Sequence, residues 1–389
     1  MKKKLKKLLD MIVKLILNFL FIFIKKSPKI IIFGDFNGKR FGDNSKYLYL
    51  YLYKYKYKHY KIIWLTRNKI IKQELNSKGY EAYYINSIKG VYYHIKALYH
   101  IVDQGENDIN PFLSHNAIKI NLWHGYPLKK IMNFCGKVNR TYVGGWEEQY
   151  LLTGTEFGEK TIGIAFGIER KKRLNGLFPR VDFLLNGEYP IFDKENEILE
   201  RIRKMKKEKK KIILYLPTYR DNNKVKFLGT EDEAVRSRFF KFLSDNNYIL
   251  ISKFHPAEKE VIGSYENEVY FNLDSTIDIY PLLRNIDLLI TDYSSVYFDF
   301  LSLNKEIIFY PYDFKEYITE IRGLLFDYNK ITPGYKAFSL ESIIEYLKKD
   351  IKLRDCYEES RKNLYRICFE DKTIEELIQN ILALDKEVK

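Results

Sequence analysis

A histidine in the first half of the sequence has the residue type and position that proton transfer requires. His124 follows the apolar run 117–123, which has the pattern of a buried strand, and it precedes Gly125. An imidazole titrates near neutral pH and can act as a general base, whereas a strand-end histidine can equally be a structural hydrogen-bond donor. Gly125 permits close approach of another backbone, and Lys129 adds positive charge nearby. This segment is therefore a candidate for binding an anionic ligand.

Side chains that can bind phosphate follow two strand-like runs in the second half. Thr218 and Arg220 lie at the end of the run 211–218, and a guanidinium can hold a phosphate through two parallel hydrogen bonds. His255 lies at the end of the run 248–256 and can donate to a phosphate oxygen. Each residue taken alone is explained as well by surface pairing or by a hydrogen bond to the backbone.

The strongest signal is the segment LLITDYSSVYFDFLSLNK. A buried strand is predicted to end at Thr291, Asp292 breaks it, and Ser294 or Ser295 is predicted to cap a helix that follows. Hydroxyls, backbone N–H groups and the positive end of a helix together suit a phosphate. A serine cap without any ligand is the alternative. Several strand-end sites of this kind in one chain favour the ligand.

The first glycine-bearing loop, 34–46, carries no nucleotide-binding fingerprint. Gly38 and Lys39 can line a ligand cleft, although a plain turn explains them nearly as well. The loop matches neither GxGxxG nor the Walker sequence, which argues against nicotinamide cofactors and ATP hydrolysis. The sequence has no HExxH, paired CxxC or compact acidic cluster, so we expect no cofactor and no metal ion. The three cysteines fit no disulfide framework and indicate a reducing cytoplasm.

The elements that must position these residues follow the alternating pattern of parallel α/β domains. Short apolar runs alternate with longer amphipathic stretches, first after Pro28 and again after the basic segment 201–211. A length of 389 residues with 46% hydrophobic residues supports two domains with separate cores. Such domains bind ligands outside the carboxyl ends of their strands, so we predict the site in a cleft between them. The predicted strands are 29–36, 60–66, 117–123, 211–218, 248–256, 269–272, 288–291 and 306–311.

The N-terminal segment has the pattern of a helix that lies on a membrane surface. Residues 1–26 contain eight lysines and one aspartate, which is nearly half of the net charge of +15. The apolar stretch 11–24 is interrupted by Lys14 and Asn18 and is shorter than the roughly 20 residues that span a bilayer. A signal peptide is the competing interpretation, but no small-residue cleavage site follows. We predict an amphipathic anchor at 1–27, an N-terminal domain at 28–187, a C-terminal domain at 188–370 and a helix at 371–389 that crosses back.

A set of ordered motifs resembles one known enzyme family. The motifs are GKRFGDNSK, WHGYPLKKI, LFPRVD, ILYLPTYR, KFHP, LLITDYSSVYFDF, FYPYDFKEY and RGLLFDY. From Ile30 onward they resemble the CDP-glycerol glycerophosphotransferases, the enzymes of teichoic acid and capsule polymer synthesis. TYR stands in place of the commoner TWR and PRVD in place of PRND, which spares the reactive residue types but leaves the alditol and the acceptor open.

The resemblance implies a GT-B fold with two Rossmann-like domains facing across a cleft, the first for the acceptor and the second for the CDP donor. It implies that a hydroxyl of a lipid-linked or polymeric acceptor attacks the β-phosphorus of CDP-glycerol and that CMP leaves. It further implies a peripheral enzyme at the cytoplasmic face of the bacterial membrane, with an anionic membrane surface as partner and no nucleic acid.

The same resemblance carries roles to particular residues. His124 resembles the catalytic base. Gly38, Lys39, Gly125 and Lys129 fall in loops expected to line the acceptor side or the cleft. The residues that resemble donor phosphate or nucleotide contacts, or lie in the matching motifs, are Thr218, Arg220, His255, Asp292, Ser294, Ser295, Asp313 and Arg322.

Three other functions compete with this prediction. A CDP-ribitol transferase of the same family differs only in the alditol. A GT-B nucleotide-sugar glycosyltransferase shares the fold but releases a nucleoside diphosphate. A basic protein that binds membranes or nucleic acid without catalysis fits the charge, although no recognised nucleic-acid motif is present.

Overall fold

The structure is a computed structural model of the chain, and it describes residues 24–55, 57–135, 149–187, 189–220, 226–254, 266–321, 323–350 and 354–386. The described residues group into two compact units. Unit 1 takes those within Met1–His124, Gly136–Phe183 and Asp371–Lys389, and unit 2 takes those within Gly125–Cys135 and Leu184–Glu370. Nearly all of the predicted N-terminal anchor lies outside the described residues. Among the residues that are described, no helix has both the length and the apolar character needed to cross a bilayer.

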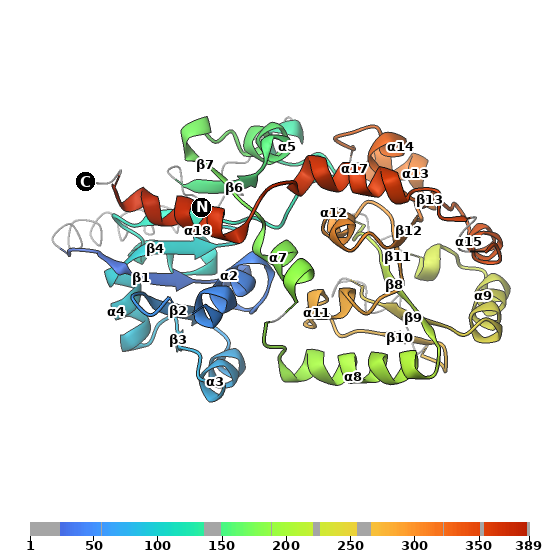
Figure 1. The fold of residues 1–389 in the computed structure, drawn as a ribbon, viewed down its shortest axis with the longest axis horizontal. Helices are drawn as coiled ribbons and strands as arrows, with labels where there is room; N and C mark the ends of the chain where they lie inside the picture. Colours follow the sequence, from blue (N-terminus) through green and yellow to red (C-terminus); the bar gives the residue numbers. More distant parts are fainter. Residues whose placement is uncertain are drawn as a thin grey trace, which may run out of the picture. The chain divides into compact units, whose positions relative to one another are not determined.

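In the described part of unit 1, seven parallel strands form one sheet in the order β3-β2-β1-β4-β5-β6-β7 (Figure 1). The strand order reverses between β1 and β4, which is the doubly wound arrangement of Rossmann-like domains. The strands are β1 (Ser27–Phe33), β2 (Lys61–Thr66), β3 (Ala82–Tyr84), β4 (Ala97–Val102), β5 (Ile118–Asn121), β6 (Tyr150–Gly154) and β7 (Arg173–Asn175).

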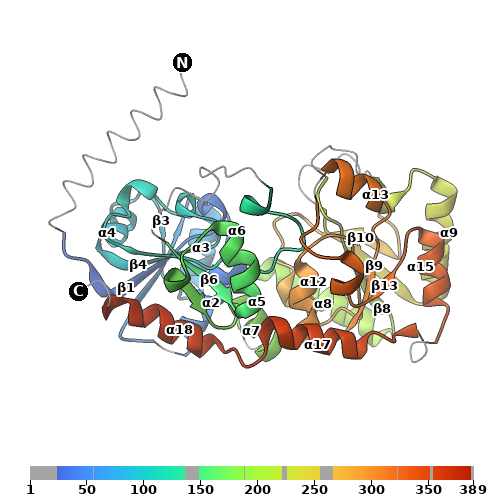
Figure 2. The ribbon, with the colours of Figure 1, turned by 90° about the horizontal axis from the view of Figure 1, so that it is seen from above.

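Helices cover the sheet of unit 1 and bury their apolar sides against it. They are α2 (Asp43–Lys54), α3 (Lys69–Ser77), α4 (Ile88–Lys96), α5 (Glu156–Gly158), α6 (Ile164–Phe166), the first part of α7 (Pro179–Asn186) and α18 (Ile374–Ala383). The C-terminal helix α18 lies beside β7 (Figures 1 and 2). The Leu177 N–H donates to the Thr373 carbonyl at 3.0 Å, and the Asn380 amide donates to the Asn175 carbonyl at 3.1 Å. These bonds fix the end of the chain to unit 1.

In the described part of unit 2, six parallel strands form a second sheet in the order β10-β9-β8-β11-β12-β13. Its order reverses between β8 and β11, so both units repeat the same topology. The strands are β8 (Lys211–Leu216), β9 (Tyr248–Ser252), β10 (Tyr270–Asn272), β11 (Leu288–Thr291), β12 (Glu306–Phe309) and β13 (Tyr335–Lys336). The helices are α8 (Asp193–Lys207), α9 (Glu233–Asp245), α11 (Tyr280–Leu283), α12 (Val296–Phe300), α13 (Phe314–Glu316), α14 (Tyr328–Ile331), α15 (Leu340–Leu347) and α17 (Glu358–Phe369).

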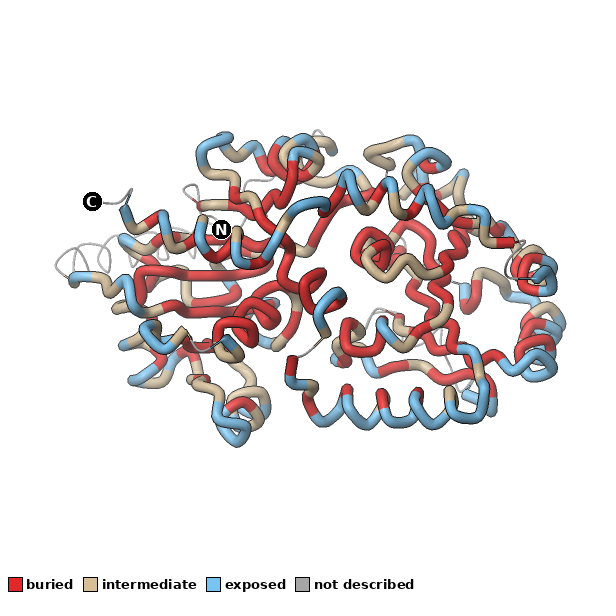
Figure 3. Tube along the Cα trace, in the orientation of Figure 1, coloured by how far each residue is buried: buried red, intermediate tan, exposed pale blue. Residues whose placement is uncertain are grey.

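The central strands of both sheets are buried at their carboxyl-terminal ends, and β4 and β11 are buried along their whole length (Figure 3). Strands covered by helices on both faces are expected to be continuously apolar, and the runs IIIF of β1 and LLIT of β11 show this pattern. Helix α8 is amphipathic instead, with Leu199 and Ile202 buried and its lysines outward. The prediction of two parallel α/β domains is confirmed, and each of the eight predicted runs contains a strand.

Candidate active site

Each unit places polar side chains where its strand order reverses. In unit 1, Asp35 follows β1 by two residues and Asp103 directly follows β4. In unit 2, Thr218 follows β8 by two residues and Asp292 directly follows β11. Doubly wound sheets bind ligands outside the carboxyl ends of their strands at this point. Both units therefore have a candidate ligand site that topology defines, and in unit 2 its residues Thr218 and Asp292 were also predicted from the sequence.

His124 lies three residues beyond the end of β5, in a turn with unusual backbone angles. Trp123 has a φ of 55°, which is rare for a residue with a side chain, and Gly125 has a φ of 89°. The Trp123 N–H donates to Asn121 Oδ1 at 2.8 Å, and the ring centroids of Trp123 and His124 are 3.6 Å apart. The imidazole is half-buried, so it is held by the fold while part of it remains accessible.

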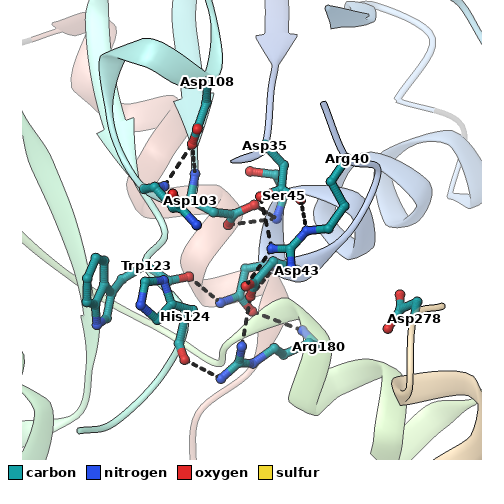
Figure 4. Close-up of polar contacts among 12 residues, drawn as sticks. Asp35, Arg40, Asp43, Ser45, Asp103, Asp108, Trp123, His124, Arg180 and Asp278 are labelled. Atoms are coloured by element: carbon teal, nitrogen blue, oxygen red, sulfur yellow. Dashed lines mark hydrogen bonds and ion pairs between the residues drawn. The ribbon is translucent and has the colours of Figure 1, made fainter. Parts of the chain in front are cut away.

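The main chain at His124 contacts a network of alternating charges in unit 1 (Figure 4). Arg180, at the start of α7, donates to the His124 carbonyl at 2.5 Å and to Asp43 Oδ1 at 2.8 Å. Asp43 is also 3.4 Å from Arg40, which donates two bonds to Asp35 at 2.7 and 3.2 Å. Two arginines thus alternate with two aspartates between the end of β1 and the turn that carries His124.

Burial dominates the protonation of the carboxyl groups beside this network. Burial raises the pKa of Asp35 to about 7, against the opposing effect of Arg40. Burial also raises the pKa of Asp103 well above its ordinary value, and the charges of Asp43 and Asp35 add to the increase. Both Asp103 oxygens accept from the Ser45 N–H, at 3.0 and 3.1 Å, and Asp108 accepts from the Gln104 N–H at 2.8 Å. Asp35 and Asp103 therefore hold their protons more readily than exposed aspartates do.

These raised pKa values predict how stability depends on pH. The folded chain keeps protons that unfolded aspartates release near pH 4, so the unfolding free energy falls as pH rises from about 4 to 7, by about 1.4 kcal/mol per pH unit for each proton. Asp103→Asn removes one such proton while keeping an oxygen that can accept from Ser45. We expect its stability to depend less steeply on pH and to exceed that of the wild type at pH 8. Urea unfolding of both proteins from pH 4 to 8 measures this, and equal slopes would contradict it.

The predicted loop residues divide between the two units. Gly38, in unit 1, has a φ of 71°, and its carbonyl accepts from the Arg67 N–H at 2.6 Å. A side chain at Gly38 would be strained at this φ and would displace the Arg67 guanidinium, which favours glycine there. Lys39 is exposed beside it. Gly125 and Lys129 belong to unit 2, where the main chain of Lys129 pairs with Leu324.

In unit 2 the predicted residues Thr218, Arg220, Asp292 and Asp313 form one buried cluster. Arg220 is 1% exposed and donates to Asp292 at 2.7 Å, to Asp313 at 2.6 and 3.0 Å and to the Thr218 carbonyl. Burial lowers the pKa of Arg220, but the charges of Asp292 and Asp313 outweigh it and hold that pKa above its ordinary value. The guanidinium also lies 5.0 to 5.4 Å from the ring centres of Tyr293, Tyr312 and Tyr317. Most of its donors are therefore engaged within the protein.

A short helix follows β11, as predicted. The α-helical turn of α12 ends at Phe300, and Leu301–Leu303 continue as a 3₁₀ turn. Ser295 has the N-cap position, but its side chain makes no capping bond, and Ser294 Oγ accepts weakly from the Val296 N–H at 3.5 Å. Both serines are half-buried. Their predicted role as phosphate contacts stays a prediction.

One hydroxyl in this cluster is buried without a partner. Thr218 Oγ1 has no hydrogen bond to any residue that the structure describes, although its N–H donates to Asp292 Oδ1 at 2.8 Å. A buried hydroxyl without a partner loses free energy unless a ligand or water satisfies it. His255 and Arg322 lie outside the described residues. Within the described ranges, no group of three or more His, Cys, Asp or Glu side chains is arranged to hold a metal ion.

Sequence reasoning did not single out Asp35, Asp43, Asn44, Asp103 and Arg180. The motifs GDNSK and LFPRVD contain Asp43, Asn44 and Arg180. The motifs could therefore be recognised in the sequence, but the roles of these three residues could not be predicted. Asp35 belongs to the loop 34–46, where the glycines and basic residues were the predicted cleft-lining groups. Asp103 follows β4, a strand that the apolar pattern did not indicate.

Comparison with known proteins gives a consistent result. A family model described as CDP-glycerol:poly(glycerophosphate) glycerophosphotransferase matches residues 16–381. The chain is 30% identical over 375 residues to the teichoic acid poly(glycerol phosphate) polymerase of Bacillus subtilis (strain 168), covering 89% of this chain and 48% of the relative. It is 29% identical over 350 residues to the Bacillus spizizenii protein of that name, covering 84% of each. The chain thus spans about half the length of the B. subtilis relative.

Solved structures resemble the whole chain. A structure described as the wall teichoic acid polymerase TagF aligns with a TM-score of 0.74 at 24% identity, covering 100% of this chain and 97% of the other. A variant of that polymerase soaked with CDPG aligns with a TM-score of 0.73 at 25% identity over the same shares. The first likeness shows the fold, and the family match covers most of the sequence. This chain belongs to the CDP-glycerol:poly(glycerophosphate) glycerophosphotransferase family.

Proposed function

We propose that this chain transfers glycerol phosphate from CDP-glycerol to a hydroxyl of a lipid-linked or polymeric acceptor, as a step in teichoic acid or capsule synthesis. The observation that carries the proposal is the family match over residues 16–381, which includes His124 and the Thr218–Asp313 cluster. The topology supports it as well, because both groups lie beyond the carboxyl ends of parallel strands.

In the proposed reaction the acceptor oxygen forms a bond to the β-phosphorus of CDP-glycerol. The bond from that phosphorus to the bridging oxygen breaks, CMP leaves with the electron pair, and His124 takes the proton of the hydroxyl. A hydroxyl is a weak nucleophile while it keeps its proton, so a base beside it lowers the barrier. The half-buried imidazole beyond β5 is suited to this role because its main chain is fixed by hydrogen bonds.

We assign the phosphates of the donor to the switch point of unit 2. Phosphoryl transfer mainly asks a protein for positioning and for groups that stabilise negative charge. Thr218, whose buried hydroxyl has no partner among the described residues, and the half-buried Ser294 and Ser295 are the proposed direct contacts. Arg220 contributes positive charge while holding Asp292 in place, and His255 remains a proposed contact by its motif.

The reaction requires His124 and the donor contacts of unit 2 to act on the same donor, so the proposal includes the GT-B arrangement in which the two domains face each other. We also place the chain at the cytoplasmic face of the membrane as a peripheral protein. The eight lysines and one aspartate of residues 1–26 support this placement, because anionic lipids attract a basic amphipathic segment.

One experiment tests donor, product and membrane contact together. The purified chain is incubated with anionic vesicles that carry a bacterial lipid extract, and CDP-glycerol, CDP-ribitol or a UDP-sugar is added. We expect CMP from CDP-glycerol, polymer phosphate in the lipid fraction and sedimentation of the chain with the vesicles. Faster turnover of CDP-ribitol would favour the alternative alditol. Release of a nucleoside diphosphate from the sugar donor, with no CMP from either CDP-alditol, would contradict the proposal.

A further inference from the structure

We propose that Arg180 and Asn44 are positioning residues for the transfer reaction and that they hold the two peptide groups on either side of His124. This inference rests on the proposed role of His124 and adds the residues that orient it. Neither side chain needs to touch the donor or the acceptor. Their action is on the backbone from which the imidazole projects.

The contacts fall on both peptide groups that flank His124. Asn44 Nδ2 donates to the Trp123 carbonyl at 2.8 Å, and Arg180 Nη2 donates to the His124 carbonyl at 2.5 Å. The first carbonyl belongs to the peptide before His124 and the second to the peptide after it. Fixing both peptide planes fixes the direction of the Cα–Cβ bond between them. The direction in which the side chain leaves the main chain is therefore fixed, whatever ligand its ring nitrogens meet.

The turn needs this support because its backbone is unfavourable without it. Trp123 adopts a φ of 55°, in the left-handed region that costs free energy for a residue with a side chain. Such conformations persist where the surrounding structure over-determines them, and they concentrate at functional sites. Here the Trp123 N–H is also held, by Asn121 Oδ1 at 2.8 Å.

The two holding side chains also fix each other. The Arg180 N–H donates to Asn44 Oδ1 at 3.2 Å, which turns the amide so that its Nδ2 faces Trp123. Arg180 Nη1 pairs with Asp43 Oδ1 at 2.8 Å, and the Arg180 side chain is 5% exposed, so it has little freedom to move. One guanidinium nitrogen thus serves the carboxylate and the other serves the His124 carbonyl (Figure 4). A lysine offers a single ammonium and cannot reproduce this fork.

Three motifs that are distant in the sequence each contribute one residue to this arrangement. Asn44 comes from GDNSK, Arg180 from LFPRVD and His124 from WHG. All three residues belong to unit 1, so their contacts do not depend on the placement of unit 2.

A purely structural role for Arg180 is the alternative, and the chain contains a matched control. Arg354 in unit 2 is similarly buried, pairs with Glu306 at 2.8 and 2.9 Å and donates to the Leu347 carbonyl at 3.0 Å. It has the same kinds of partner, and its hydrogen-bond partners all lie in unit 2. Arg354→Lys therefore reports what losing a buried arginine fork does to the fold alone.

The kinetic test compares Arg180→Lys, Asn44→Ala and Arg354→Lys, each scaled to its folded fraction. We expect Arg180→Lys to lower kcat about 100-fold with KM for CDP-glycerol unchanged, because small misplacement of a reacting group has effects of this size. Asn44→Ala should change kcat in the same direction, and Arg354→Lys should leave kcat unchanged. In a His124→Ala background, Arg180→Lys should cause no further loss, since a positioned group is then absent.

Histidine-selective NMR gives a readout that does not depend on turnover. The chain has six histidines, and His124 is identified by the resonance lost in His124→Asn. We expect the His124 resonance to shift in Arg180→Lys and in Asn44→Ala but not in Arg354→Lys. An unshifted resonance together with wild-type kcat in Arg180→Lys would overturn the inference. If His124→Ala itself turned over at the wild-type rate, the proposed function of His124 would fail instead, so the two failures are distinguishable.

Discussion

Replacing His124 by alanine is expected to lower kcat for CMP release by about 10²- to 10⁴-fold, the range that a positioned general base contributes. Binding of CDP-glycerol should change little, because the proposed phosphate contacts belong to unit 2. Stopped assays of CMP measure the first quantity, and equilibrium dialysis with labelled CDP-glycerol measures the second. The two together separate loss of chemistry from loss of donor binding.

His115→Ala is the matched control for this variant. His115 is also half-buried in unit 1 and lies shortly before β5, but no hydrogen bond or ion pair among the described residues joins it to the network around His124. It should leave kcat unchanged. Equal losses in both variants would indicate damage to the fold, and wild-type turnover in His124→Ala would remove His124 from the role of base.

Replacing Arg220 by methionine is expected to destabilise unit 2 by about 3–5 kcal/mol, because it leaves a buried charge without its partner. Asp292 is 1% exposed and Asp313 is 10% exposed, and both depend on this guanidinium. Adding Asp292→Asn and Asp313→Asn to Arg220→Met should restore part of the loss, since the uncompensated charges are then removed. Chemical unfolding followed by fluorescence measures these differences.

Arg354→Met provides the comparison, because it leaves one buried carboxylate, Glu306, where Arg220→Met leaves two. We expect the Arg220 variant to be the less stable of the pair. If Arg220→Met folded with wild-type stability but lost affinity for CDP-glycerol, the guanidinium would serve the donor and not the cluster.

Most of the strands could be predicted from the sequence because buried parallel strands are continuously apolar. Runs such as KIIIF and LLIT are too apolar to be loops and too short for buried helices, and each proved to contain a strand. Strand β4 was missed because ALYHIV contains a histidine and a tyrosine and continues from α4 without a breaker. Strands β3, β7 and β13 are only two or three residues long, which is too short for an apolar or alternating pattern to be recognised.

The residues of the site could be predicted only in part, for a different physical reason. Residues at strand ends, such as Thr218 and Asp292, can be found because topology brings the ends of adjoining strands together. Arg180 and Asn44 act through hydrogen bonds to backbone carbonyls, and no spacing rule predicts which carbonyl a distant side chain will reach. The pairing of Arg220 with two carboxylates could not be predicted from the sequence either, because Asp313 is 93 residues away along the chain.

The central claim is that His124 activates an acceptor hydroxyl for attack on the β-phosphorus of CDP-glycerol. Phosphorus NMR of CDP-glycerol with acceptor-bearing vesicles, recorded in parallel for the wild type and for His124→Ala, tests it most directly. The claim predicts that the wild type converts the pyrophosphate signals into CMP and a new phosphodiester, while the variant leaves CDP-glycerol intact. Equal conversion by both proteins, or release of CDP in place of CMP, would contradict it.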